Sequence, residues 1–78
     1  MYYVYVLKEK GGTLYKGFTS DLKKRFKEHN SGKIRSTKTH KPWKLIYYEA
    51  FAFKKDARRE EIFLKTGKGR ERLKYLFD

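Results

Sequence analysis

Arg25 lies close to an apolar stripe in the stretch "TLYKGFTSDLKKRFKEHNSGK". Leu22, Phe26 and His29 fall at positions i, i+4 and i+7 of one helical face, and Arg25 lies on the same side. A guanidinium matches a phosphate with a bidentate fork, so an arginine at the border of a core and a cleft could grip a phosphate. The alternatives are an arginine whose stem covers Phe26 and a histidine stabilised by the dipole at a helix end.

Two tyrosines in strand-like segments, Tyr5 and Tyr15, carry further functional groups. Each could be a packed aromatic residue whose hydroxyl has a hydrogen-bond partner. The ordinary pKa of tyrosine is about 10, so a tyrosine acts as a base only where a nearby Mg²⁺ or arginine lowers that pKa.

Glu60 and Glu61 are neighbouring carboxylates on the predicted second helix, and either could hold a metal. One carboxylate together with water and substrate oxygens makes an ordinary Mg²⁺ site. Glu61 could equally be the i,i+4 partner of Lys65. Glu60 is about as close to the buried helix face as Glu61, so helical periodicity does not choose between them.

The net charge of +12 and the pI near 10 are the strongest compositional signal. Such an excess on 78 residues favours a polyanionic partner, most often nucleic acid. The charge is spread over the chain, whereas a membrane-surface peptide concentrates it on one amphipathic helix. A basic surface that serves solubility alone is the alternative.

The chain has no cysteine, which excludes disulfides and thiolate metal sites and is compatible with a reducing compartment. No apolar run reaches the roughly 20 residues that span a bilayer. The first ten residues, "MYYVYVLKEK", do not have the pattern of a secretory signal. We therefore expect a cytoplasmic protein with no membrane partner, folded as a single domain over residues 1–78.

The helices and strands that must position these groups are predicted from hydrophobic periodicity and from the positions of turn and capping residues. Residues 2–7 and 14–18 are predicted strands joined by a Gly-Gly hairpin turn, and residues 43–53 form a third strand, apolar on both faces and therefore expected at the centre of the sheet. Thr19 and Ser20 are the N-cap candidates of a first helix over residues 21–30, which Gly32 ends in a left-handed conformation.

A second helix is predicted over residues 54–66, stopped by Gly67, and a third from about Arg70 to Phe77. The order strand, strand, helix, strand, helix, helix predicts a small α+β (mixed α/β) domain with a three-stranded, mainly antiparallel sheet. The "GKGR" at residues 67–70 is too short for a P-loop, and we interpret it as a helix junction whose amides could still contact a phosphate.

These segments together resemble a GIY-YIG nuclease domain, and more narrowly its small stand-alone UvrC-like members. Tyr3-Val4-Tyr5 matches the first motif and Tyr15-Lys16-Gly17 the second. Tyr3 replaces the glycine of the first motif, and Lys16 replaces an apolar residue of the second. A lysine at such a strand position must reach solvent or meet a phosphate.

The resemblance implies a metal-dependent endonuclease that hydrolyses one phosphodiester bond in DNA, linked to DNA repair or processing. It assigns catalytic roles to Tyr5, Tyr15, Arg25 and His29, and Mg²⁺ binding (or Mn²⁺) to Glu61. Which tyrosine positions or deprotonates the attacking water stays open. The competing hypotheses are a non-catalytic nucleic-acid-binding module of the same fold and a nuclease that works only with a repair-complex partner.

Basic residues outside the proposed chemistry are the candidates for phosphate contacts, which carry little sequence information. Branched, damaged or single-stranded DNA, or RNA, remain open as substrates. The candidate nucleic-acid-binding residues are Lys16, Lys33, Arg35, Lys38, Lys41, Lys68 and Arg70, with His40 in the same basic loop.

Overall fold

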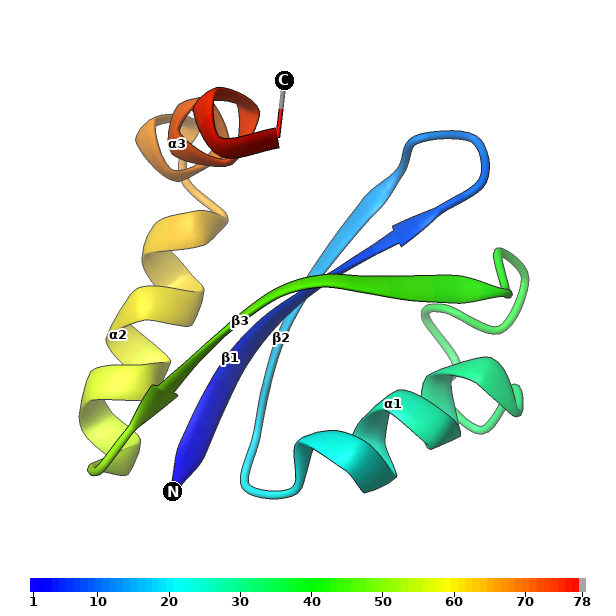
Figure 1. Cartoon of the computed structure of the whole chain (residues 1–78), viewed down its shortest axis with the longest axis horizontal. Coiled ribbons are helices and arrows are strands. Elements are labelled where there is room, and N and C mark those ends of the chain that lie inside the picture. The colour runs from blue at the N-terminus through cyan, green and yellow to red at the C-terminus, as the bar shows by residue number, and fades with distance from the viewer. Residues whose placement is uncertain (78) are drawn as a thin grey trace.

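The computed structural model describes residues 1–77 and consists of one antiparallel sheet with helices on both faces (Figure 1). The class and the element order are those predicted from the sequence. In chain order the elements are β1 (Tyr2–Glu9), β2 (Leu14–Thr19), α1 (Leu22–Asn30), β3 (Trp43–Phe51), α2 (Lys54–Leu64) and α3 (Gly67–Phe77).

β1 is the central strand, and the prediction that the third strand would be central is wrong. The strands lie in the order β2-β1-β3, so β3 is at an edge. Four consecutive residues of β1, 4–7, are buried, whereas most of β3 is only half-buried or exposed. Apolar residues on both faces of β3 indicate that helices cover both faces of the sheet. All three strands share this cover, so the pattern does not distinguish a central strand from an edge strand.

Alternation along β1 divides the core into two clusters. Val4 and Val6 face α2 and α3, where they pack against Ala57, Leu64 and Leu73. The intervening residues 5 and 7 face α1 and pack near residue 43. Figure 1 shows α1 on one side of the sheet and α2 with α3 on the other.

The first helix begins one residue later than predicted, because Asp21 is its N-cap. The Asp21 carboxylate accepts from the backbone N–H of Lys24 at 3.1 Å, which satisfies an amide of the first turn. Thr19 instead accepts from the Asp21 backbone N–H and orders the turn before the helix, so neither Thr19 nor Ser20 is the cap. Gly32 has a φ of 82°, as predicted for the residue after the helix.

The junction of α2 and α3 is tighter than the sequence predicted. Gly67 does not stop α2, which ends at Leu64, but opens α3. Thr66 caps α3 through a hydrogen bond from the Gly69 backbone N–H to its hydroxyl, at 3.2 Å. A Cβ at position 69 would overlap the backbone of Phe63, so this glycine allows α3 to cross the end of α2 closely. The Gly69 amide is therefore engaged within the junction.

No helix within residues 1–77 combines the length and apolar character that crossing a bilayer requires.

Candidate functional site

Tyr5 lies at the centre of the candidate site because β1 directs it toward α1, and it is 1% exposed. Its Cα pairs with that of Gly17 on β2. A Cβ at position 17 would overlap the Tyr5 ring and hydroxyl, so glycine is required for the ring to lie across β2. Since β2 is an edge strand, the glycine directs the Tyr5 hydroxyl toward the edge of the sheet.

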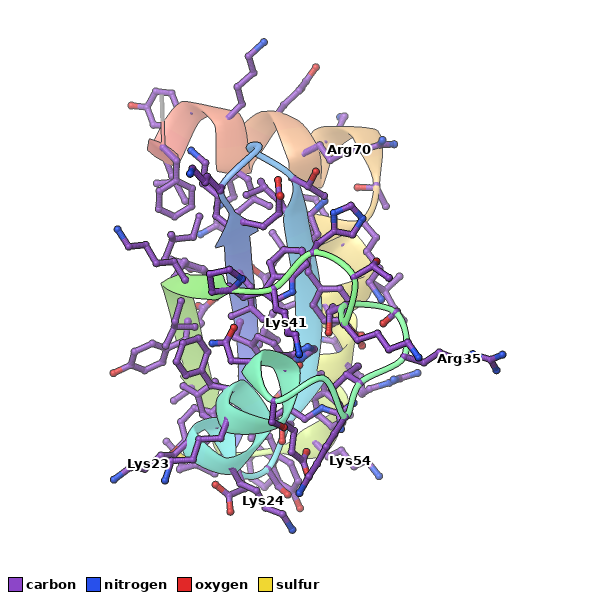
Figure 2. All side chains as sticks on the ribbon, turned by 90° about the vertical axis from the view of Figure 1, so that its right-hand side faces the viewer. Lys23, Lys24, Arg35, Lys41, Lys54 and Arg70 are labelled. Carbon is purple, nitrogen blue, oxygen red and sulfur yellow. The ribbon has the colours of Figure 1, made fainter. Side chains whose placement is uncertain are left out.

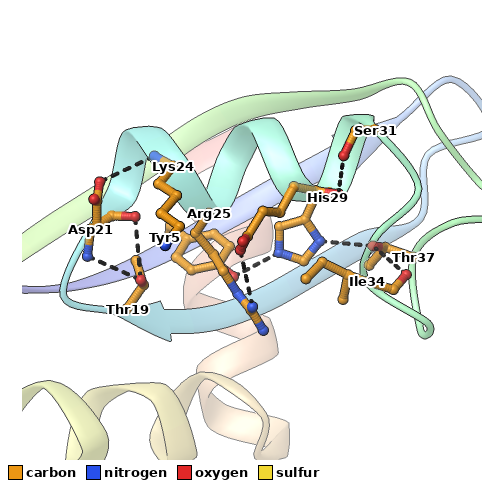
Figure 3. Close-up of polar contacts among 10 residues, drawn as sticks. Tyr5, Thr19, Asp21, Lys24, Arg25, His29, Ser31, Ile34 and Thr37 are labelled. Carbon is orange, nitrogen blue, oxygen red and sulfur yellow. Dashed lines mark hydrogen bonds and ion pairs between the residues drawn. The ribbon is translucent and has the colours of Figure 1, made fainter.

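The Tyr5 hydroxyl is the first member of a buried hydrogen-bonded chain (Figure 3). It lies 2.8 Å from Nε2 of His29, and Nδ1 of His29 lies 2.7 Å from Oγ1 of Thr37. The Thr37 hydroxyl donates to the carbonyl of Ile34 at 3.4 Å. Because that bond uses the only proton of Thr37, we assign the His29 proton to Nδ1. Nε2 is then the acceptor for the Tyr5 hydroxyl.

Thr37 is held in turn by Trp43 at the start of β3. The indole Nε1–H donates to the Thr37 carbonyl at 2.9 Å. The backbone of Trp43 exchanges two hydrogen bonds with the side-chain amide of Asn30, at 2.6 and 3.0 Å. The loop between α1 and β3 is thereby fixed at the point where it supports His29.

Tyr15 lies on the same face of the sheet, next to these groups. Its ring centroid is 4.9 Å from that of His29 and 6.3 Å from those of Tyr5 and Trp43. Both predicted tyrosines therefore meet the predicted histidine in one aromatic cluster at the β2 edge.

Arg25 reaches the site from α1, one turn before His29. Its guanidinium pairs with Glu28 at 3.4 Å, and its side chain is 38% exposed, so this ion pair contributes little to stability. Burial lowers the pKa of Arg25, but the Tyr5 hydroxyl, Glu28 and Tyr15 together raise it above the ordinary value. The guanidinium thus lies beside the buried chain and is open to solvent at the same time (Figure 3).

The electrostatics of the site keep its buried groups uncharged. Burial raises the pKa of Tyr5 to about 12, against the opposing effect of Arg25 and with smaller raising effects of Tyr15 and Glu61. Burial, and then the positive charge of Arg25, lower the pKa of His29. At neutral pH, Tyr5 therefore carries its proton and His29 is a neutral acceptor for it.

Glu61 lies on α2, and its charge makes the smallest contribution to the raised pKa of Tyr5. Its carboxylate lies 3.3 Å from Nη1 of Arg58 and 3.1 Å from Nζ of Lys65, with its side chain 11% exposed. The alternative ion pair with Lys65 is therefore present. Glu60 is instead paired with Arg72 of α3 at 2.9 Å. The folded structure thus gives the two glutamates different partners, a distinction that helical periodicity could not make.

Comparison with known proteins identifies the family. The profile described as the GIY-YIG catalytic domain matches residues 1–74. The chain belongs to the GIY-YIG family. A UPF0213 protein of Bacillus pumilus is 47% identical over 66 residues, covering 83% of this chain and 67% of that protein. A UPF0213 protein of Streptococcus agalactiae is 43% identical over 75 residues, covering 95% and 85%.

A solved structure shares the fold. The solution NMR structure of a UPF0213 protein of Bacillus halodurans superposes with a TM-score of 0.60 at 37% identity, covering 99% of this chain and 86% of the other. The homologues of this GIY-YIG domain are thus UPF0213 proteins, whose name states no activity. Membership of a nuclease family implies a nucleic-acid substrate.

The donor set of this GIY-YIG domain suits a hard divalent cation that shares one protein carboxylate with water and phosphate oxygens. Residues 1–77 contain no group of three or more His, Cys, Asp or Glu side chains that could enclose a metal. Glu61 is the buried carboxylate available for this role, and both of its oxygens already face cations. A metal there would displace the ammonium of Lys65 or the guanidinium of Arg58.

The predicted nucleic-acid-binding residues of the GIY-YIG domain fall into two groups (Figure 2). The first lies on the loop between α1 and β3, where Arg35 projects into solvent. The second lies on β2 and α3, where half-buried Lys16 is close to Arg70. The first group consists of Lys33, Arg35, Lys38 and Lys41, and the second of Lys16, Lys68 and Arg70.

Sequence reasoning missed two residues that hold the site together. Thr37 supports His29, while Arg58 joins the predicted partner Lys65 in neutralising Glu61. Thr37 stands in a loop without periodicity, so no pattern marks it. Arg58 and Lys65 stand at i−3 and i+4 from Glu61, a spacing that does predict ion pairs once Glu61 is chosen.

Proposed function

We propose that this protein is a divalent-cation-dependent endonuclease that hydrolyses phosphodiester bonds in DNA. The observation that carries the proposal is the hydrogen bond of 2.8 Å between the Tyr5 hydroxyl and Nε2 of His29, with Arg25 and Glu61 acting on the same hydroxyl. A buried proton donor and a neutral acceptor meet there beside a guanidinium, and a buried carboxylate on α2 acts on them through its charge. Hydrolysis of a phosphodiester needs such a set of groups.

The geometry supports a route for the proton of the attacking water. As the water oxygen bonds to phosphorus, its proton passes to the Tyr5 oxygen and the Tyr5 proton passes to Nε2 of His29. The bond from phosphorus to the leaving oxygen breaks, and that oxygen takes a proton from solvent. Because the pKa of Tyr5 is about 12, Tyr5 can accept the water proton only while it gives up its own.

Arg25 has the position to bind the phosphate whose negative charge increases during attack. It is partly exposed, lies beside the Tyr5 hydroxyl and is paired with Glu28, so little reorganisation would be needed when the phosphate arrives. Tyr15 borders the same site and would position the attacking water or the phosphate.

Glu61 would hold Mg²⁺, with Mn²⁺ as a substitute of similar coordination. A bound divalent cation would supply charge stabilisation and lower the pKa of coordinated water. Its arrival would release Lys65 or Arg58 from Glu61, and the released cation would then be free to contact a substrate phosphate.

The basic groups around the site support recognition of shape rather than sequence, since phosphate contacts carry no sequence information. This is the behaviour expected of a nuclease in DNA repair or processing. Target choice would then come from the form of the nucleic acid or from a partner in a repair complex.

Nicking of supercoiled plasmid by the purified protein in Mg²⁺, with and without a chelator, tests the proposal. We expect nicking that needs the metal and is lost in Tyr5→Phe. The second candidate is a binding module of the same fold, favoured by the ion pairs that already neutralise Glu61. DNA binding without cleavage of plasmid, flap or single-stranded substrates in either metal would establish that second candidate.

A further inference from the structure

A groove of about 340 Å³ lies between α3 and the β1–β2 hairpin, on the face of the sheet opposite α1. Four cations surround it, Lys8, Lys16, Arg70 and Lys74. None of these four takes part in an ion pair with another residue of the described range 1–77. The groove has the size of a small-ligand pocket and a strong positive charge.

The floor of this hairpin–α3 groove is apolar. Leu14, Leu73 and Phe77 line it, and the Phe77 ring is held edge-on against Tyr47 with the centroids 5.9 Å apart. Phe77 remains 37% exposed, so its ring is available to a ligand. A ligand of this groove therefore needs an anionic part for the rim and a flat apolar part for the floor.

Lys16 connects the groove to the candidate active site. It is half-buried on β2, and its pKa is lowered by burial and then by the charges of Arg70 and Lys65. Lys65 is also the partner of Glu61 at 3.1 Å. Of the two cations that act on Lys16, Lys65 is therefore paired with Glu61, and Arg70 lines the groove together with Lys16. Crowded like charges of this kind are relieved by a polyanion.

We propose that the hairpin–α3 groove binds an unpaired nucleotide of the strand whose phosphate lies at the active site. Lys16 and Arg70 would contact the phosphate of this nucleotide, and its base would lie on Leu14 and Phe77. Paired bases are stacked inside a duplex and cannot enter a recess, whereas unpaired bases stack on aromatic side chains. This inference rests on the proposed function and adds to it a preference for substrates with a single-stranded segment.

The test compares two fluorescent oligomers of about twelve nucleotides, a size within the range that single-strand-binding modules cover. One is oligothymidylate, and the other has the same number of phosphates but abasic sugars. Binding is measured by fluorescence anisotropy in a chelator, so that cleavage plays no part. We expect the wild type to bind oligothymidylate at least fivefold more tightly, the lower end for one base stacked on an aromatic ring.

Two pairs of variants separate the rim from the floor. Phe77→Ala should bring the affinity for oligothymidylate close to that for the abasic oligomer. Tyr75→Ala is the matched control, because Tyr75 lies on the same helix and is 86% exposed. Arg70→Ala should lower the salt slope for both oligomers by about one unit. Lys55→Ala, which removes an exposed charge at the start of α2, should leave that slope unchanged.

Equal binding of the two oligomers by a folded wild type would overturn the groove proposal and leave the nuclease proposal standing. Absence of plasmid nicking by a wild type that still prefers oligothymidylate would contradict the nuclease proposal and support the groove proposal. Competition with thymidine monophosphate distinguishes a nucleotide within a strand from a free nucleotide. If the monophosphate displaced the oligomer at equal concentration, the groove would be a site for a free nucleotide, which would contradict the proposal.

Discussion

The Tyr5 hydroxyl and Nε2 of His29 lie 2.8 Å apart, and this contact joins the central strand to the first helix. Both side chains are buried, at 1% and 0% exposure. Burial raises the pKa of Tyr5 and lowers that of His29. At neutral pH the phenol therefore keeps its proton, and Nε2 of His29 is an unprotonated acceptor beside it. The contact therefore has a consequence for proton transfer that a packed aromatic pair would lack.

Replacing Tyr5 with Phe should cut Mg²⁺-dependent nicking by roughly 10²-fold or more, the scale of general acid–base catalysis. The ring would still lie across Gly17, so the fold should survive. His29 would lose the partner of a buried nitrogen, which costs about 1–3 kcal/mol of the free energy of unfolding. Single-turnover nicking and a melting curve measure the two effects.

Tyr2→Phe is the control, since Tyr2 stacks on Phe18 on the opposite face of the sheet. An equal loss of nicking in both variants would show that the effect is not specific to the Tyr5 proton.

Thr37→Val should impair nicking although Thr37 is proposed to contact neither metal nor phosphate. The variant keeps the shape of the side chain but leaves Nδ1 of His29 without its oxygen, so the tautomer is no longer fixed. Thr37→Ser keeps the hydroxyl and should retain most of the activity. Nitrogen NMR of His29 reports the tautomer directly. An unchanged tautomer in Thr37→Val would show that Thr37 has a packing role only.

Much of this site could be predicted from local pattern, because its residues stand on regular elements. The spacing of Leu22, Phe26 and His29 placed Arg25 correctly on α1, and the two strand motifs placed both tyrosines. Thr37 could not be predicted, since a loop residue that supports a side chain eight positions earlier leaves no periodic signal.

The position of β3 could not be predicted for a different reason. Its length and its apolar residues on both faces are typical of a buried strand, but β1, which is shorter by one residue, occupies the centre. Strand order depends on pairings between distant residues. Likewise, periodicity does not separate Glu60 from Glu61, and the two differ only in the partners that the folded chain gives them. Glu60 pairs with Arg72 of α3, whereas Glu61 pairs with Arg58 and Lys65.

Acidification should destabilise the protein through His29. Its pKa is lower in the folded than in the unfolded chain, so the unfolded chain binds more protons as the pH falls through about 6.5, the ordinary value. The free energy of unfolding therefore decreases as the pH is lowered. The gap in melting temperature between wild type and His29→Gln should therefore narrow from pH 8 to pH 5. A gap that stays constant would mean that His29 does not titrate differently on folding.

The basic loop between α1 and β3 should control affinity and not folding. We expect binding to unrelated duplexes to weaken with salt by about 0.9 log units per log unit of salt for each phosphate neutralised. Lys38→Ala or Arg35→Ala should each lower that slope by about one unit without changing the melting temperature, because both side chains are exposed. A flat salt response, or strong preference for one sequence, would contradict binding through phosphates.

Glu61→Ala should abolish Mg²⁺-dependent nicking and leave DNA binding intact or slightly stronger. The variant removes the proposed metal ligand and frees Arg58 and Lys65, so two more cations can meet the phosphates. Arg25→Ala should also lose roughly 10²-fold in nicking, the scale for one preorganised charge donor. Plasmid nicking and anisotropy in a chelator measure activity and binding separately.

Glu60→Ala is the matched control for Glu61→Ala, because it removes a neighbouring carboxylate that is paired with Arg72 and lies away from Tyr5. It should keep its nicking activity and lose only the small stability of that ion pair. Loss of nicking in Glu60→Ala with activity retained in Glu61→Ala would move the metal site to the other glutamate. Removing the negative charge of Glu61 should by itself strengthen the contact of Arg58 and Lys65 with phosphates. Weaker DNA binding by Glu61→Ala would therefore mean that the two cations had lost their positions. Glu61 would then serve to position Arg58 and Lys65 for the substrate rather than to hold a metal.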